Sequence, residues 1–406
     1  MLHGAARTVQ TERVDASLTL GVQHKSVPPR LWGRDAASVV AEGLTVADLQ
    51  TPVLALDRAA EAGNTATMVS WAREQGVELA PHGKTTMSPE LWRRLLDAGC
   101  WGITLATPWQ VQVARAAGLA QIVLANEVAD PAGIAWIAAE LDADPGFELL
   151  CWVDSLEGVA LLAASPGSRP IDVAVELGDA GGRTGARGAA AARAVADAVA
   201  AAPRLRLRGV AGYEGSYGSD RSASTTARVR DYLRQLRALF ESLEADGLLQ
   251  EPVLTAGGSA WFDLVADEFV GVRATVIVRA GAFQAHDDVF YTGVSPFAET
   301  DRAFAPALHA WARVVSRPEP GLALLDAGKR DLPSDLGMPV VYGIPDATIS
   351  QLADQHAYLR LPAGHPLAIG DLVRLGISHP CTAFQLWSLI PEVDGDRVVG
   401  FIETVF

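Results

Sequence analysis

The stretch VELAPHGK, residues 77–84, is a short and mostly apolar run that ends in a lysine. Similar runs recur from about residue 50 and alternate with longer Ala-, Leu- and Arg-rich segments of helical period. They are PVLALD (52–57), VELAPHGK (77–84), GITLAT (102–107), QIVLANEV (121–128), FELLCWVDS (147–155), IDVAVELG (171–178), LRLRGVAGYEG (205–215) and PVLTAGGS (252–259). Eight strand-then-helix units predict an α/β fold with a closed (β/α)8 TIM barrel. A doubly wound sheet is the structural alternative, but no glycine fingerprint for a dinucleotide follows the first run.

The pattern changes after about residue 270. The later runs, among them ATVIVRAG, AWARVVSR, LALLDAG, AYLRLP and RVVGFIETVF, are separated by Gly, Pro and Asp turns rather than by helical segments. This pattern is typical of a mainly antiparallel β domain. We therefore expect an N-terminal extension (1–45) that could pack on the β domain, a barrel (46–270) and a β domain (271–406).

Composition limits the classes of partner. The 406 residues are 49% hydrophobic and 20% charged, with a formal net charge of −15. Such a charge disfavours nucleic acid and anionic membranes as partners. No window approaches about 18 uninterrupted apolar residues, which excludes a predicted transmembrane span. The first 20 residues lack an apolar signal core, so the expected location is cytoplasmic.

Lysine is rare in this chain. Only Lys25, Lys84 and Lys329 occur, and the rest of the 33 basic residues are arginine. An ammonium group can lose its proton and attack a carbonyl, whereas a guanidinium stays charged. A lysine taken alone is most often a surface residue. Lys84, however, stands at the C-terminal end of the second predicted strand, where barrel enzymes gather their functional groups.

Other candidates end later strands of the same barrel. Arg183 follows the sixth run in ELGDAGGRTG, and Tyr213 and Glu214 end the seventh. The turn Gly257–Gly258–Ser259 after the eighth run offers clustered backbone N–H groups and a hydroxyl, which suits a phosphate. Each of these, taken singly, is more simply a surface arginine or a tight turn. Their shared position at strand ends favours one site.

A metal pair is the second candidate. His379 and Cys381 are two residues apart in SHPCTAF (378–384), a strand-like run that would place both side chains on one face. Imidazole and thiolate are zinc ligands. The spacing alone favours a buried cysteine beside an incidental histidine, because two ligands make an incomplete site. A third ligand would come from elsewhere in the chain, from water or from substrate.

From about residue 46 onward the chain resembles the fold-type III pyridoxal-phosphate enzymes, which share the alanine racemase architecture. Within them it is most similar to the D-serine dehydratase and D-threonine aldolase family. The segments that carry the resemblance are PHGKTTMSPELW, GITLATPWQ, ELGDAGGRTG, GYEGSYG, TAGGSAWF, VRAGAFQAHD, LDAGKRDLPSDLG and GISHPCTAFQLW. Three features depart from the family pattern: Phe283 replaces a usual tyrosine, Gln355 replaces a glutamate, and the lead-in GISHPC is uncommon.

The resemblance implies roles for the candidates. Lys84 would bind pyridoxal 5'-phosphate covalently, Arg183 would contact the pyridine nitrogen, and Tyr213 would lie near the cofactor. The phosphate would be held by Gly257, Gly258 and Ser259. A catalytic divalent metal, most often zinc in the dehydratases, would bind His379 and Cys381.

The resemblance also implies a reaction. We expect pyridoxal-phosphate- and metal-dependent β-elimination on a small-molecule D-β-hydroxy amino acid such as D-serine, D-threonine or D-threo-3-hydroxyaspartate, giving a 2-oxo acid and ammonia. Cys381 favours this reaction, because the family's dehydratase branch pairs histidine with cysteine and its aldolase branch pairs histidine with aspartate. Retro-aldol cleavage, racemisation and non-catalytic cofactor binding stay open, although the β domain argues against a simple carrier. By analogy with fold-type III relatives, we expect a homodimer.

Overall fold

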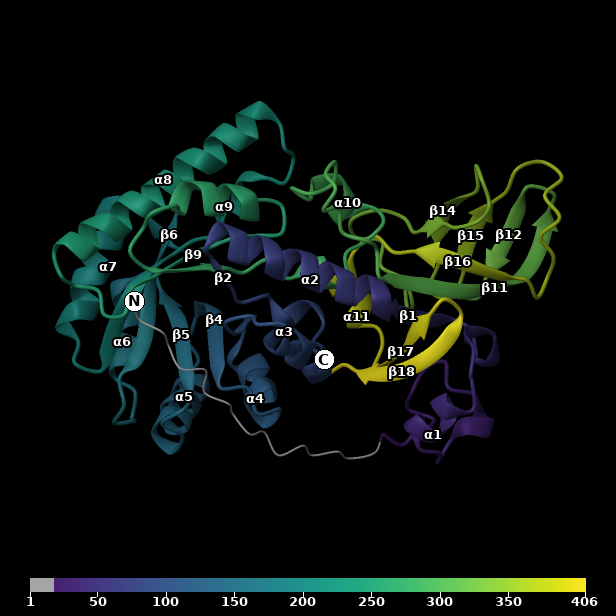
Figure 1. Ribbon diagram of the computed structural model, residues 1–406, viewed down its shortest axis with the longest axis horizontal. Helices are drawn as coiled ribbons and strands as arrows, with labels where there is room; N and C mark the ends of the chain where they lie inside the picture. Colours follow the sequence, from purple (N-terminus) through teal and green to yellow (C-terminus); the bar gives the residue numbers. More distant parts are fainter. Residues whose placement is uncertain (1–17) are drawn as a thin grey trace.

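The computed structural model describes residues 18–406, which form two sheets side by side along the long axis of the molecule (Figure 1). The first sheet is parallel and has the strand order β2-β10-β9-β8-β6-β5-β4-β3, with a short extra strand, β7, beside β6. A parallel bridge between His82 and Thr104 connects the two ends of this series. The predicted (β/α)8 barrel is therefore confirmed. Its strands are β2 (Glu78–Leu79), β3 (Ile103–Leu105), β4 (Gln121–Glu127), β5 (Glu148–Val153), β6 (Ile171–Gly178), β7 (Ala186–Arg187), β8 (Leu205–Ala211), β9 (Val253–Ala256) and β10 (Thr275–Val278).

Helices surround the barrel and start at residues that suit helix N-termini. Side chains of Asp57, Thr107, Asp130, Ser155 and Ser222 each accept a hydrogen bond from a backbone N–H of the first turn, which satisfies a donor left free by the helix. The apolar faces of these helices pack on the strands in one large core. The barrel helices are α2 (Arg58–Gln75), α3 (Pro89–Asp97), α4 (Pro108–Ala116), α5 (Pro131–Ala143), α6 (Leu156–Ala163), α7 (Ala189–Ala201), α8 (Ala223–Ala245) and α9 (Phe262–Phe269), with the 3-10 turns η3 (Gly83–Thr85), η4 (Glu214–Tyr217) and η5 (Ala282–Gln284).

The second sheet is antiparallel except where β1 pairs with β17, and it confirms the predicted β domain. Its core is separate from that of the barrel. Its strands are β1 (Val53–Asp57), β11 (Leu308–Glu319), β12 (Leu322–Leu325), β13 (Val340–Val341), β14 (Thr348–Leu352), β15 (Ala357–Arg360), β16 (Leu372–Gly376), β17 (Leu389–Asp394) and β18 (Arg397–Glu403). Two short helices, α10 (Phe290–Val294) and α11 (Pro380–Phe384), lie in the connections.

The predicted domain boundaries, 46–270 for the barrel and 271–406 for the β domain, are wrong by one strand at each end of the barrel segment. The first run, PVLALD, is β1 and pairs with β11 and β17 in the second sheet. The run ATVIVRAG, assigned to the β domain, contains β10 and closes the barrel between β9 and β2. A short apolar strand buried on both faces has the same pattern in either sheet, so the sequence does not distinguish the two positions.

The N-terminal segment from Leu18 packs on the β domain. Its 3-10 turns η1 (Pro29–Leu31) and η2 (Val46–Asp48) and its helix α1 (Ala36–Ala41) place Leu20, Leu31 and Val39 against Leu389 and Val398. The part of the extension before Leu18 lies outside the described residues. Within residues 18–406, no helix combines the length and the apolar character that crossing a membrane needs.

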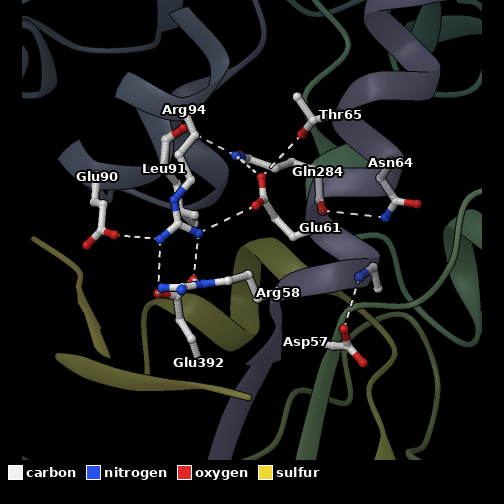
Figure 2. A network of polar contacts seen from close by, with 11 residues as sticks. Asp57, Arg58, Glu61, Asn64, Thr65, Glu90, Leu91, Arg94, Gln284 and Glu392 are labelled. Carbon is white, nitrogen blue, oxygen red and sulfur yellow. Dashed lines mark hydrogen bonds and ion pairs between the residues drawn. The ribbon is translucent and has the colours of Figure 1, made fainter. Parts of the chain in front are cut away.

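An ion-pair network joins the two domains (Figure 2). Glu392 of β17 is fully buried. Its carboxylate accepts hydrogen bonds from Arg58 of α2 and from both terminal nitrogens of Arg94 of α3. Arg94 also contacts Glu90 and the buried Glu61. Burial alone would raise the pKa of Glu392, but the hydrogen bonds from Arg94 and Arg58 outweigh it and lower the pKa. The network therefore fixes the β domain against the barrel helices.

Candidate active site

A cavity of about 310 Å³ opens at the C-terminal ends of the barrel strands. This volume falls in the usual range for a small-molecule site. Every residue predicted to bind the cofactor lines it, and Cys381 reaches it from the β domain. Its lining includes His82, Lys84, Thr85, Trp152, Glu176, Arg183, Tyr213, Gly257, Gly258, Ser259, Arg279, Tyr291 and Cys381.

Lys84 lies in η3, directly after the loop that follows β2. The loop is held by the indole N–H of Trp92, which donates to the carbonyl oxygen of Gly83 at 3.0 Å. A Cβ at Gly83 would lie 2.6 Å from that indole nitrogen, so only glycine fits there. Burial lowers the pKa of Lys84, and the charges of Arg183 and Arg279 lower it further, against an opposing effect of Cys381. A lysine that loses its proton readily is what imine formation requires.

His82 is a cavity residue to which the sequence assigned no role. Burial, followed by the charges of Lys84 and Arg279, lowers its pKa well below the usual value, so the ring is neutral. Its Nδ1 is buried and has no hydrogen-bond partner among the described residues. A free polar atom beside Lys84 fits a cavity that binds a polar ring such as pyridoxal phosphate.

The glycine turn after β9 corrects one prediction. The N–H groups of Gly257 and Gly258 donate to the two carboxylate oxygens of Glu214, at 3.0 Å in the case of Gly257. Glu214 is fully buried. Because a carboxylate already satisfies both amides, the two glycines are not free to hold a phosphate. Ser259, whose Oγ accepts from the N–H of Ala282 at 3.4 Å, is the predicted residue of this turn that keeps a hydroxyl facing the cavity.

Arg183 and Tyr213 lie together at the cavity, as expected. The guanidinium of Arg183 lies 4.7 Å from the centre of the Tyr213 ring. Burial and the charge of Glu214 raise the pKa of Tyr213, so its hydroxyl stays protonated.

Arg279 is a buried cation that the sequence reading missed. Its Nη1 donates to the Thr255 hydroxyl at 2.6 Å and its Nη2 to the Gly212 carbonyl oxygen at 2.7 Å. These bonds connect the ends of β8, β9 and β10 at the base of the cavity. The sequence feature that could have identified this residue is an arginine directly after the mostly apolar strand TVIV, at its C-terminal end.

The metal pair does not lie on a strand, contrary to the sequence prediction. His379 is the N-cap residue of α11 and Cys381 lies in its first turn. Pro380 suits the first turn of a helix, which explains why this run forms a helix and not the predicted strand. The two side chains are nevertheless in contact. Burial lowers the pKa of His379, but the hydrogen bond with Cys381 and the nearby Asp335 outweigh it and raise the pKa to about 9.

Asp335 orients the histidine. Its Oδ2 lies 2.6 Å from Nδ1 of His379 and also accepts from the Thr382 hydroxyl at 3.0 Å. With Nδ1 engaged, Nε2 is the ring nitrogen left for a metal, as in a carboxylate–histidine–metal arrangement. The Sγ of Cys381 lies 3.2 Å from the hydroxyl of Thr85, the residue after Lys84. The donor set fits zinc and adjoins the lysine.

Comparison with known proteins agrees with this geometry. Residues 56–282 match the family model "Alanine racemase, N-terminal domain", and residues 307–393 match a serine dehydratase domain model. The D-threonine aldolase of Arthrobacter sp is 28% identical over 347 residues, which cover 85% of this chain and 89% of that protein. The 3-hydroxy-D-aspartate aldolase of Paracoccus denitrificans (strain Pd 1222) is also 28% identical over 347 residues, which cover 83% of this chain and 87% of that protein.

Solved structures give the same result. The D-threonine aldolase from Filomicrobium marinum superimposes with a TM-score of 0.79 at 26% identity, covering 89% of this chain and 97% of that one. The D-threo-3-hydroxyaspartate dehydratase from Delftia sp. HT23 has a TM-score of 0.71 at 23% identity, covering 89% and 99%, and supports the fold alone. The family match spans more than half of the chain and contains Lys84 and most of the residues that line the cavity. The chain therefore belongs to the alanine racemase N-terminal domain family, and it is a fold-type III pyridoxal phosphate enzyme of the lyase kind.

Proposed function

We propose that this enzyme eliminates water from a D-β-hydroxy amino acid, such as D-serine, D-threonine or D-threo-3-hydroxyaspartate, and releases a 2-oxo acid and ammonia. The observation that carries the proposal is the contact between Cys381 and Thr85, which brings the His379–Cys381 pair next to Lys84. Support for the substrate class comes from relatives named for D-threonine and 3-hydroxy-D-aspartate.

Lys84 is the base in this proposal. Pyridoxal phosphate, when bound, withdraws electrons from Cα of an amino acid attached to it. Substrate binding would free the Lys84 amine, and burial, which lowers its pKa, favours the neutral amine that can accept the Cα proton. Arg183, which lies against Tyr213 in the cavity, would contact the pyridine nitrogen of the cofactor.

His379 and Cys381 act at the β-carbon. A zinc ion held there would act as a Lewis acid and make hydroxide a better leaving group. Asp335 keeps the imidazole in place. The two protein ligands leave coordination positions for water and for substrate.

Tyr291 favours elimination over carbon–carbon cleavage. It lines the cavity with Cys381, and its ring centre lies 6.4 Å from that of His379. Burial raises the pKa of Tyr291 strongly, so its hydroxyl stays protonated. A protonated phenol can donate a proton to departing hydroxide. Retro-aldol cleavage instead needs a base that removes the proton of the β-hydroxyl group.

Retro-aldol cleavage is the second candidate, because the relatives from Arthrobacter and Paracoccus denitrificans are named as aldolases. D-Threonine separates the two reactions. Elimination gives 2-oxobutanoate and ammonia, whereas cleavage gives glycine and acetaldehyde. We expect 2-oxobutanoate as the main product, and its loss on treatment with a strong chelator while the visible absorption of the cofactor persists. Glycine as the main product would reject the dehydratase proposal.

A homodimer, a cytoplasmic location and zinc as the metal are also proposals. Sedimentation equilibrium of the holoenzyme tests the first, cell fractionation the second, and elemental analysis of the purified enzyme the third.

A further inference from the structure

Three acidic side chains converge at the C-terminal ends of neighbouring barrel strands. Glu127 ends β4, Asp154 follows β5 and Glu176 lies near the end of β6. These three strands are adjacent in the sheet. One carboxylate oxygen from each residue lies within 4.8 Å of the others. We call this group the acidic triad.

The triad is buried and poorly satisfied. Glu176 is only 4% exposed, and its Oε2 is buried without a hydrogen-bond partner among the described residues. Both carboxylate oxygens of Glu127 are likewise buried without a partner. Asp154 accepts one hydrogen bond, from the N–H of Gly185 at 3.1 Å. Burying unpaired carboxylates is costly, so the site needs a proton or a cation.

The groups that face the triad do not neutralise it. Burial raises the pKa of Glu127 to about 8, and the charge of Glu176, its close approach to the Glu127 carboxyl group and the charge of Asp154 add to this effect. Arg279 is a buried cation whose pKa the charge of Glu176 raises, but its guanidinium is already hydrogen-bonded to Thr255 and Gly212. A positive charge placed between the carboxylates would remove the repulsion.

We infer that a hard divalent cation binds between Glu127, Asp154 and Glu176. The donor atoms are all carboxylate oxygens, which Ca²⁺, Mg²⁺ and Mn²⁺ prefer. Oxygens on opposite sides of one ion lie about 4.8 Å apart for Ca²⁺ and about 4.2 Å apart for Mg²⁺, twice the metal–oxygen distance. The observed spacing therefore allows a single ion to contact all three residues. The nitrogen and sulfur donors of His379 and Cys381 form a different kind of site.

The cation would stabilise the loop that carries Arg183. Asp154 already fixes this loop through the N–H of Gly185. Gly185 has φ +97°, and a Cβ there would lie 2.4 Å from the nitrogen of Gly178, so the loop returns closely to the end of β6. An ion at the triad would join the ends of three strands to the base of this loop. The triad is thus a structural cation site that positions Arg183.

The test uses holoenzyme in which His379→Ala and Cys381→Ser remove the other metal pair. Equilibrium dialysis with Ca²⁺ and electron paramagnetic resonance with Mn²⁺, each at up to about 1 mM, count bound ions over the affinity range of protein sites. We expect one ion per chain. The nearly isosteric changes Glu127→Gln and Asp154→Asn should weaken binding by about tenfold or more. Glu299→Gln, at an exposed carboxylate away from the triad, should leave binding unchanged.

Two results would overturn the inference. One is that no Ca²⁺ or Mn²⁺ is retained by the double variant at this concentration, with circular dichroism showing that the protein is folded. The other is that Glu127→Gln binds as much ion as its parent and melts at a higher temperature at pH 8, which would identify a shared proton instead. Neither result depends on the proposed elimination, because the readout is ion binding.

Discussion

Replacing Glu392 by alanine should loosen the connection between the barrel and the β domain. The change leaves Arg94 and Arg58 without the fully buried carboxylate that both of them contact (Figure 2). Breaking a buried ion pair costs about 3–5 kcal/mol. The side chains of Arg94 and Arg58 are 24% and 46% exposed, so solvent compensates partly and we expect about 3 kcal/mol. With an unfolding entropy of about 2.1 cal/mol/K per residue over 406 residues, this corresponds to a Tm lower by about 3–4 °C.

Glu90→Ala is the matched control. Glu90 contacts the same arginine, but its side chain is 43% exposed, and an exposed ion pair contributes about 0–1 kcal/mol. Its Tm should fall by about 1 °C or less. The measurement is differential scanning calorimetry of both variants at pH 7.

The effect of Glu392→Ala should also depend on pH. Because the folded-state pKa of Glu392 is lowered, its contribution is complete above the unfolded-state pKa of about 4.3 and is lost as the pH falls through the folded value. Equal Tm values for Glu392→Ala and Glu90→Ala at pH 7 would show that the buried ion pairs of Glu392 do not hold the two domains together.

Three further predictions concern the site. Ser259→Ala should weaken cofactor binding by about tenfold or more in equilibrium dialysis, because a hydrogen bond to a charged group contributes about 1.5–3 kcal/mol; unchanged binding would remove Ser259 from the phosphate site. Asp335→Asn should lower zinc affinity by about 10–100-fold without changing the visible spectrum, since it acts only by orienting His379; an unchanged affinity would exclude that role. Tyr291→Phe should slow elimination by about 100-fold or more with the cofactor retained, and a rate near that of the parent would show that another acid protonates the leaving group.

The residues at the C-terminal ends of the barrel strands were predictable from the sequence. Hydrophobic periodicity locates the strands, and the barrel topology brings their C-terminal ends to one face. The order of the apolar runs predicted that four residues lie at the C-terminal ends of the barrel strands, and all four line the cavity: Lys84, Arg183, Tyr213 and Ser259. The carboxyl ends of parallel strands meet at one edge, so residues far apart in sequence must converge there.

Long-range partners were less predictable. Glu214 lies beside Tyr213 in the sequence, but its bonds to the amides of Gly257 and Gly258 depend on how β8 and β9 align. The start of α11 was misread because HPC alternates like a strand, whereas proline after an extended residue begins a helix. Asp335 reaches His379 across 44 residues of loop and strand, a distance over which local patterns carry no information.

The identity of the lysine that carries the cofactor decides whether the barrel cavity is the active site. Borohydride reduction of the purified holoenzyme, followed by proteolysis and mass spectrometry, distinguishes the three lysines of the chain. We expect the pyridoxyl group on the peptide that contains Lys84, and loss of the visible absorption in Lys84→Ala. Lys25 is held by Asp331 and stacks on Trp387, away from the cavity. A label on Lys25 or Lys329 would contradict the assignment of the barrel cavity as the active site.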